Sequence, residues 1–207
     1  MRLSPAVEAV VWLLWNAVGW KRARERRVLS MALCQEVLDA AFEVDGGGYP
    51  HSLAGVARGL SLVLGGFGAG AVPPGHGGDL WGRCGVLGAG LPGVQFEPLG
   101  VGIHAPTVKG LIDRGIPIAA SLAVGESYDD VRDVCTGDIR KPLWDEWLYR
   151  GAVVILLGWD DDLRRYRVRF CDGGIRGRSG LGWVHYDHGV SRVLTQELVI
   201  IPRIIQL

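Results

Sequence analysis

Asparagine and lysine are scarce in this chain of 207 residues. Asparagine occurs once, at Asn16, and only three of the 22 basic side chains are lysines. The 22 acidic side chains balance the basic ones, so the formal net charge at pH 7 is zero and electrostatic attraction to nucleic acid is not expected. The preference for arginine and glycine is typical of a GC-rich genome, which indicates a bacterial or phage origin.

Cysteines are also few, and nothing in their spacing marks a metal site. The four are Cys34, Cys84, Cys135 and Cys171. None forms a CxxC pair, and none stands at a metal-ligand spacing from a histidine. His76 and Asp79 lie close together, but two residues do not make up the three or four ligands of a site. The sequence therefore predicts no metal and no cofactor.

A signal peptide and a membrane span are not expected. Residues 7–20 are mostly apolar, and the basic run 21–27 follows them. A signal peptide has the reverse order, with its basic residues first. The apolar run also falls short of the roughly 20 residues that span a bilayer. This pattern predicts a buried helix, in a protein located in the cytoplasm or incorporated into a virion.

The order of the expected elements is helices first and strands last. Ser4 and Pro5 suit a helix start, and helices are expected over 5–24, 31–42, 53–64 and 107–114. Strands are expected over 116–124, 152–159, 164–171, 181–185 and 197–201. This order predicts a single α+β domain, 1–207, with a helical lobe of about 1–105 and a β lobe of about 106–207.

Three segments together resemble the papain-like cysteine peptidases. The first is RGAVVILLGWDDDLRRYRVRF over 150–170, in which Gly158 to Asp161 match the family's G-[YW]-D-D hairpin. The second is GGYPHSLAGVA over 47–57, and the third is VKGLIDRGIPIAASLAVGESYDD over 108–130. The resemblance implies a papain-like two-lobed fold, with a long central helix in the N-terminal helical lobe and a C-terminal antiparallel β lobe.

The same resemblance implies that the catalytic residues are missing. The positions that match the family's Cys, His and Asn hold Pro5, Gly151 and Phe170. The segment with the oxyanion-stabilising Gln has no counterpart before Pro5. Loss of a nucleophile and its base lowers the rate of such a reaction by several orders of magnitude. The expectation is therefore a pseudoenzyme, a degenerate member of the family without peptidase activity.

Such a domain is expected to serve as a structural or protein-binding subunit of a larger assembly. The assembly that we favour is a phage virion or tail. Its partners would be other protein subunits. Trp144 and Trp147 lie in a polar segment and are interface candidates, because tryptophan is enriched at binding hot spots. Packing of these two side chains over the domain's own core is the alternative.

Two other functions remain open. One is a cysteine peptidase-like enzyme with a displaced nucleophile at Cys34, Cys84 or Cys171, where His185 or His188 would serve as the base for Cys171. The other is a monomeric pseudoenzyme that binds extended peptides along a glycine backbone edge. The residues expected to line that peptide cleft are Gly47, Gly48, Tyr49 and His51.

Overall fold

The computed structural model describes residues 5–18, 53, 97–100, 105–133, 137–148, 150–171, 180–188 and 198–200. The chain divides into two compact units. The first comprises Met1–Glu97 and Ile201–Leu207, and the second comprises Pro98–Ile200. Most of the described residues belong to the second unit.

In the first unit the main described element is the helix α1, Pro5–Val18. Proline suits the first turn, where its missing N–H is not needed. The buried side chains of α1 are Ala6, Val7, Ala9, Val10, Val11 and Leu13. The expected helices 31–42 and 53–64 fall outside the described residues, except that Leu53 is helical and buried. The helical lobe as a whole therefore stays a prediction.

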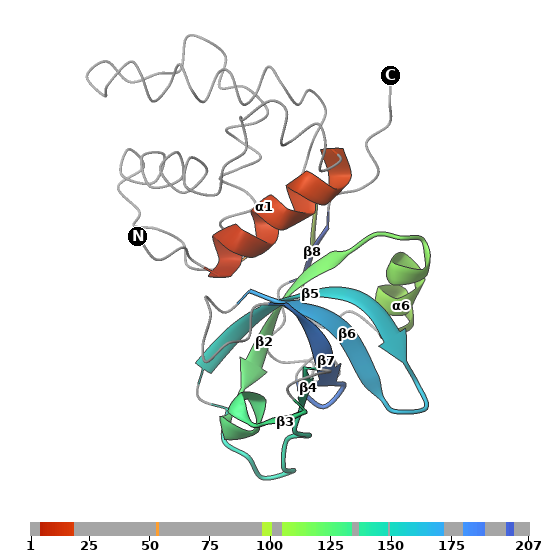
Figure 1. Ribbon diagram of the computed structural model, residues 1–207. Helices are drawn as coiled ribbons and strands as arrows, with labels where there is room; N and C mark the ends of the chain where they lie inside the picture. Colours follow the sequence, from red (N-terminus) through yellow and green to blue (C-terminus); the bar gives the residue numbers. More distant parts are fainter. Residues whose placement is uncertain are drawn as a thin grey trace, which may run out of the picture. The chain divides into compact units, whose positions relative to one another are not determined.

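The second unit combines a helix with a sheet of short strands (Figure 1). The helix is α6, Ala105–Asp113, and a single 3-10 turn, η1, covers Glu126–Asp129. The strands are β1 Glu97–Gly100, β2 Ile118–Val124, β3 Val131–Asp133, β4 Asp138–Ile139, β5 Arg150–Asp160, β6 Arg165–Phe170, β7 Leu181–His185 and β8 Leu198–Ile200. Within the described ranges, no helix has the length and apolar character needed to cross a membrane.

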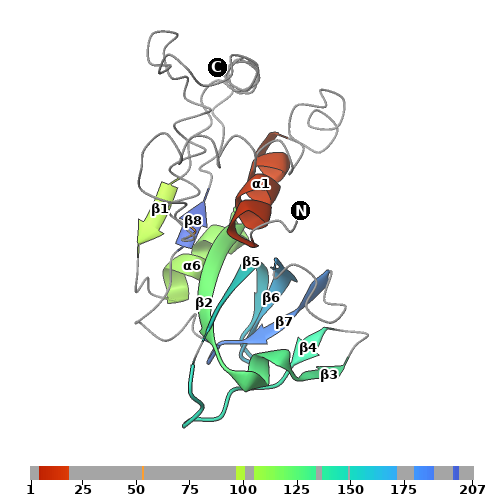
Figure 2. The ribbon, with the colours of Figure 1, turned by 90° about the vertical axis from the view of Figure 1, so that its left-hand side faces the viewer.

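The strand order in the sheet is β1-β8-β2-β5-β6-β7-β4-β3. Strands β2, β5, β6 and β7 form its centre and pair antiparallel with one another in that order (Figure 2). Strand β5 is the longest, and it pairs along β2 from Leu156 opposite Ile118 to Arg150 opposite Val124. Strand β5 is hydrogen-bonded to β2 on one side and to β6 on the other, so it sets the register of both neighbouring strands.

The core of the second unit follows from the alternation of side chains along the strands. In β6, Tyr166, Val168 and Phe170 are buried, whereas Arg167 between them is exposed. Strands β2 and β5 add Ile118, Ala120, Leu122, Val124, Ala152, Val154 and Leu156 to the same cluster. Val108 and Leu111 of α6 complete it, so α6 packs on the sheet through its apolar face.

The pairing of β4 with β7 departs from the expected antiparallel lobe. An antiparallel β lobe was predicted, but β4 pairs with β7 in parallel, with Asp138 opposite Trp183. Strand β4 has two residues, and β5 and β6 lie between it and β7 in the chain, so no hairpin joins β4 to β7. A strand this short carries no period in the sequence, so its direction could not be read from a pattern.

Candidate functional site

The positions that the resemblance assigns to the catalytic groups lie at the ends of three elements. Pro5 begins α1, Gly151 is the second residue of β5, and Phe170 ends β6. Phe170 pairs with Val154, so the last two positions lie near each other on neighbouring strands. Gly151 is exposed, and a Cβ there would have no atom within 4 Å. Phe170 is buried in the core.

Strand β5 contains a bulge that affects this assignment. Leu156 pairs with Val168, but Gly158 pairs with Arg167, so two steps on β5 face one step on β6. A count from the Gly158–Asp161 motif back to the start of β5 therefore passes through one extra residue. A shift of one position would place Arg150 or Ala152 there, and neither carries an imidazole.

Cys171, the described cysteine, is completely buried. Its backbone N–H donates to the carbonyl of Val153 at 3.1 Å, which extends the β5–β6 contact by one residue. Arg165, at the opposite end of β6, pairs with His185. Six residues at about 3.3 Å each put His185 about 20 Å from Cys171 along the sheet. His185 therefore does not serve as a base for this thiol.

His188 is likewise separated from Cys171. The ring of Tyr128 makes edge contacts with Phe170, at 6.1 Å between centroids, and with His188, at 5.9 Å. Successive residues of a strand point to opposite faces, so Cys171 points away from the face on which Phe170 meets Tyr128. Cys171 is thus a small buried side chain in the described part of the chain, with neither histidine beside it.

The imidazole of His188 holds the backbone near Arg140. It is 1% exposed, and its Nε2 lies 2.6 Å from the carbonyl oxygen of Arg140. Because a carbonyl only accepts, Nε2 carries the proton, and Nδ1 is buried without a partner among the described residues. Burial is the main reason why the pKa of His188 is lowered, although the contact with Arg140 opposes that change. The ring is therefore neutral at pH 7.

A second histidine forms a small polar cluster at the surface. The Asp187 backbone N–H donates to Nδ1 of His185 at 3.3 Å, and the Asp187 carboxylate pairs with Lys141 at 3.2 Å. Burial lowers the pKa of His185, and the nearby Asp187 carboxylate partly offsets that effect. Burial alone would raise the pKa of Asp187, but the hydrogen bond from Lys141 outweighs it and the pKa is lowered. This histidine–aspartate pair has no described cysteine beside it.

Glu146 forms an anchor that the sequence pattern did not reveal. Its Oε1 accepts from the backbone N–H of Ser127 at 2.8 Å and from the Ser127 hydroxyl at 2.7 Å. Its Oε2 accepts from the N–H of Leu143 at 3.1 Å. Burial would raise the pKa of Glu146, but the hydrogen bonds from Ser127 and Leu143 outweigh it, so the pKa is lowered. No local signal in the sequence predicts that a carboxylate accepts hydrogen bonds from a residue 19 positions away.

The Gly158–Asp161 hairpin, which carries part of the resemblance, has a structural role here. Asp161 accepts a hydrogen bond from the Tyr186 hydroxyl at 2.7 Å and pairs with Lys109 of α6, and these two contacts lower its pKa. The Lys109 ammonium also lies 5.0 Å from the centre of the Trp159 ring. Trp159 Nε1–H donates to Asp113 at 2.8 Å. Together these contacts fasten α6 to the β5–β6 turn.

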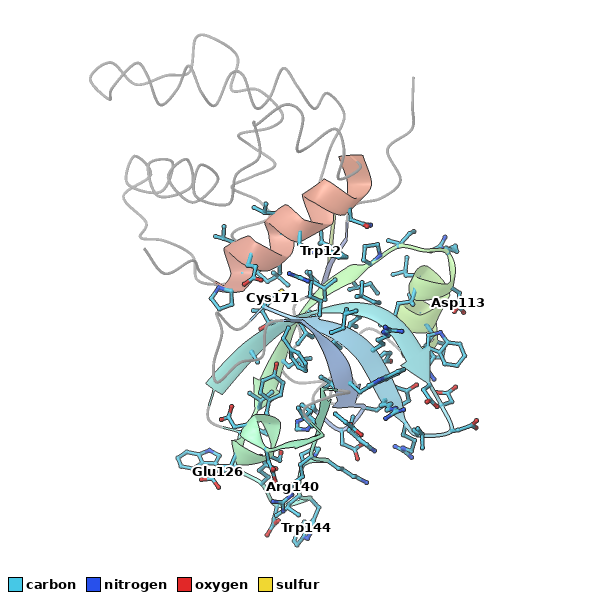
Figure 3. The ribbon with its side chains drawn as sticks, in the orientation of Figure 1. Trp12, Asp113, Glu126, Arg140, Trp144 and Cys171 are labelled. Carbon is cyan, nitrogen blue, oxygen red and sulfur yellow. The ribbon has the colours of Figure 1, made fainter. Side chains whose placement is uncertain are left out.

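The remaining predicted site residues divide into two groups. The peptide-cleft residues Gly47, Gly48, Tyr49 and His51 lie outside the described residues. Trp144 and Trp147 are 89% and 82% exposed, so the alternative that they pack over the core of their own domain is wrong. Figure 3 shows Trp144 at the same end of the second unit as Glu126 and Arg140. In the part of the chain that the structure describes, no cluster of His, Cys, Asp and Glu could hold a metal ion.

Comparison with known proteins finds similarity in fold only. The sequence matches no family model and no curated protein. A solved structure that does match is the crystal structure of xylellain, a cysteine protease from Xylella fastidiosa. The two chains are 15% identical, the match covers 96% of this chain and 78% of that one, and the TM-score is 0.63.

This similarity corrects one prediction and confirms another in its coarse form. The prediction that the chain is not an enzyme is contradicted, because the matching structure is that of a cysteine protease. That prediction depended on counting residues to Pro5, Gly151 and Phe170. Catalytic groups are defined by their geometry and can come from different positions in the chain, so counting was insufficient. The architecture itself agrees with the resemblance found in the sequence: the chain has a papain-like fold.

Proposed function

We propose that the chain is a hydrolase of the papain-like cysteine protease type, with a nucleophile displaced from the usual position. The observation that supports this proposal is the similarity in fold to a cysteine protease over 96% of the chain, at a TM-score of 0.63. A fold does not by itself define a function, so the chemistry has to come from this chain's own residues. The proposed substrate is a polypeptide, cleaved at a peptide bond.

The proposed reaction needs a thiol and a base. A cysteine thiolate attacks the peptide carbonyl carbon, the C–N bond breaks, and the leaving amine takes a proton from a histidine. Water then hydrolyses the thioester and restores the thiol. The family's own positions, as matched here, hold Pro5, Gly151 and Phe170, which have no group that transfers a proton. The reaction therefore requires a cysteine and a histidine from elsewhere in the chain.

The described residues narrow the choice of nucleophile. Cys171 is buried and separated from both described histidines, which leaves Cys34, Cys84 and Cys135. The histidines that remain as candidate bases are His51, His76 and His104. A low thiol pKa next to one of these imidazoles would make a single cysteine far more reactive than the others.

Thiol labelling combined with an activity assay tests the proposal. The full chain is treated with one equivalent of iodoacetamide at pH 7, and the labelled cysteine is identified by mass spectrometry of peptides. We expect one of Cys34, Cys84 and Cys135 to react first. Its replacement by serine should abolish cleavage of unfolded casein, whereas Cys171→Ser, the matched control, should retain it. Uniform slow labelling together with no cleavage of casein would refute the proposal.

A second candidate function is favoured by the exposure of Trp144 and Trp147. Side chains this large and apolar are enriched at binding hot spots, so the chain would serve as a subunit of a larger protein assembly. A phage virion or tail is the assembly that the composition favours. Native mass spectrometry of material isolated from its own source tests this role. A complex of fixed stoichiometry supports it, and a monomer of 22.4 kDa contradicts it.

A further inference from the structure

Two tryptophans and a leucine stand out from the surface in residues 140–148, which we call the tryptophan loop. Trp144 is 89% exposed, Trp147 is 82% exposed and Leu143 is 51% exposed. Large apolar side chains gathered on one surface segment mark interaction sites more often than isolated ones do. Tryptophan in particular supplies a large share of binding energy where it is buried by a partner. The tryptophan loop therefore requires an explanation beyond folding.

The tryptophan loop is held in place at both ends. At its start, the Arg140 carbonyl lies 2.6 Å from His188 Nε2, and Lys141 pairs with Asp187 at 3.2 Å. Near its end, the Glu146 carboxylate accepts hydrogen bonds from Ser127 and also from Leu143 within the loop. A surface that is ordered before binding loses less conformational entropy when a partner arrives. The loop thus presents its indole rings on a fixed support.

The charges around the tryptophan loop are mainly acidic. Asp145 lies between the two tryptophans and is exposed. Exposed acidic residues also occupy η1 and the position after it, namely Glu126, Asp129 and Asp130. A Cβ on Gly125 would come within 2.7 Å of the Trp147 carbonyl oxygen, so this acidic segment lies directly beside the loop. Figure 3 shows Glu126 and Trp144 at the same end of the unit.

The two described basic side chains of the tryptophan loop, Arg140 and Lys141, have acidic partners. Arg140 pairs with Asp130 at 3.6 Å, and Lys141 pairs with Asp187. Among the side chains that the structure describes here, indole faces and carboxylates are therefore exposed without an excess of positive charge. Arginine and lysine bind to both kinds of group, by stacking on an indole ring and by pairing with a carboxylate. Nucleic acid and anionic lipid would instead meet repulsion here.

We propose that the tryptophan loop is a docking site for a basic segment of a partner polypeptide. Trp144 and Trp147 contact the partner's arginine or lysine side chains and neighbouring apolar groups, while Asp145 and Glu126 pair with its charges. This role does not rest on the proposed hydrolysis, because none of these residues takes part in that reaction. It holds whether the chain cleaves polypeptides or not.

Fluorescence anisotropy of a labelled peptide tests this docking site. The peptide is a 12-residue chain of alternating arginine and leucine, added to the full-length protein, and a peptide of alternating glutamate and leucine serves as its control. We expect saturable binding of the arginine peptide that weakens as salt increases, and no binding of the glutamate peptide. Equal binding of the two peptides would overturn the assignment of a basic partner.

Variants locate the binding. Trp144→Ala combined with Trp147→Ala should raise the dissociation constant of the arginine peptide by about tenfold or more, the effect typical of hot-spot residues. Asp145→Asn combined with Glu126→Gln should weaken binding of the arginine peptide and reduce the dependence of that binding on salt. Leu163→Ala, another exposed apolar residue at 55% exposure, is the matched control and should bind as the parent does. Because all these side chains are exposed, unchanged circular dichroism and melting temperature are expected.

Two outcomes with the tryptophan variant or with vesicles would refute the docking site. One is unaltered peptide binding by the double tryptophan variant. The other is binding to vesicles of phosphatidylglycerol that depends on both tryptophans while the arginine peptide does not bind, which would identify a membrane-contact loop instead. Absence of any peptide binding would count against the proposal in the same way.

Discussion

Gly182 and Gly151 differ in what a single added methyl group would meet. A Cβ on Gly182 would lie 2.4 Å from Phe170 Cε2 and 2.5 Å from the Gly137 carbonyl oxygen. We expect Gly182→Ala to lower the free energy of unfolding by about 1–3 kcal/mol, the range for an overpacked core. Gly151→Ala, where the added atom would have open space, should change it by less than about 0.5 kcal/mol. Urea denaturation measures both, and equal stability of the two variants would contradict the packing described here.

His188 gives the stability of the protein a dependence on pH. Its pKa is lowered in the folded state, mainly by burial, so the unfolded chain takes up a proton at a higher pH than the folded one does. The contribution of the neutral ring is therefore complete above the ordinary histidine pKa of about 6.5 and is lost as the pH falls below that value. We expect the melting temperature to fall between pH 7 and pH 5.

His188→Gln is the variant that isolates this effect. A glutamine amide can still donate to the Arg140 carbonyl but does not titrate, so the fall in melting temperature should become smaller. His185 also has a lowered pKa and contributes in the same direction, which leaves part of the fall in place. Glu146 and Asp187, whose pKa values are lowered too, act at more acidic pH. A variant that loses as much stability as the parent between pH 7 and pH 5 would rule out His188 as the source.

Sequence reasoning at the residue scale succeeded where a pattern repeats and failed where a contact is unique. The strand expected over 164–171 is β6, Arg165–Phe170, in which Tyr166, Val168 and Phe170 are buried. Nothing comparable announces Glu146, because its hydrogen bonds reach Ser127, 19 residues away. His188 is similar, since its partner Arg140 is 48 positions distant. Such contacts depend on the fold, not on neighbours in the chain.

Among the elements, α6 and β7 were predicted best. The helix expected over 107–114 covers Ala105–Asp113, and the strand expected over 181–185 is β7, Leu181–His185. Both patterns depend on local periodicity and on turn residues, which act within a few positions. Strand β4 was not predicted because its two residues are too few to show a period.

Helix α6 allows a matched pair of substitutions at adjacent positions. Leu111 is buried in the core cluster, whereas Gly110 is exposed and a Cβ there would have no atom within 4 Å. We expect Leu111→Ala to cost about 2–5 kcal/mol of stability. Gly110→Ala should add about 0.5–1 kcal/mol, because alanine loses less backbone entropy in a helix. Thermal unfolding of both proteins checks this, and destabilisation by Gly110→Ala would show that α6 is not the regular helix described.

On the scale of the whole molecule, the fold was more predictable than the activity. Three segments in the right order were enough to indicate the papain-like fold, which the similarity to xylellain supports along most of the chain. The inference about activity needed the identity and geometry of a few side chains instead. Residue counting along the sequence could not supply that geometry. The place in a phage assembly stays a prediction.

The balance of charge leads to a prediction for the whole protein. The formal net charge is zero at pH 7, so repulsion between molecules is weakest there. Solubility should pass through a minimum near pH 7 and increase on either side. Leu163→Lys, which replaces an exposed leucine with a cation, should move that minimum to higher pH. Measurement of the protein remaining in solution across a pH series checks both statements. A minimum more than one pH unit from 7 for the parent would mean that the formal charge misrepresents the folded protein.

Strand β8 has a consequence for the route by which the sheet forms. It pairs with β2 through Ala119 and Val199, which are far apart along the chain, and β1 reaches the rest of the sheet only through β8. The hairpin of β5 and β6 closes a short loop and can form early, whereas the β2–β8 contact closes a long one and is slower. Until β8 arrives, β2 has an open backbone edge, the kind of edge at which partly folded chains join one another. Association between molecules during refolding is therefore expected to begin at β2. The rate at which β8 pairs with β2 would then decide the yield of native protein.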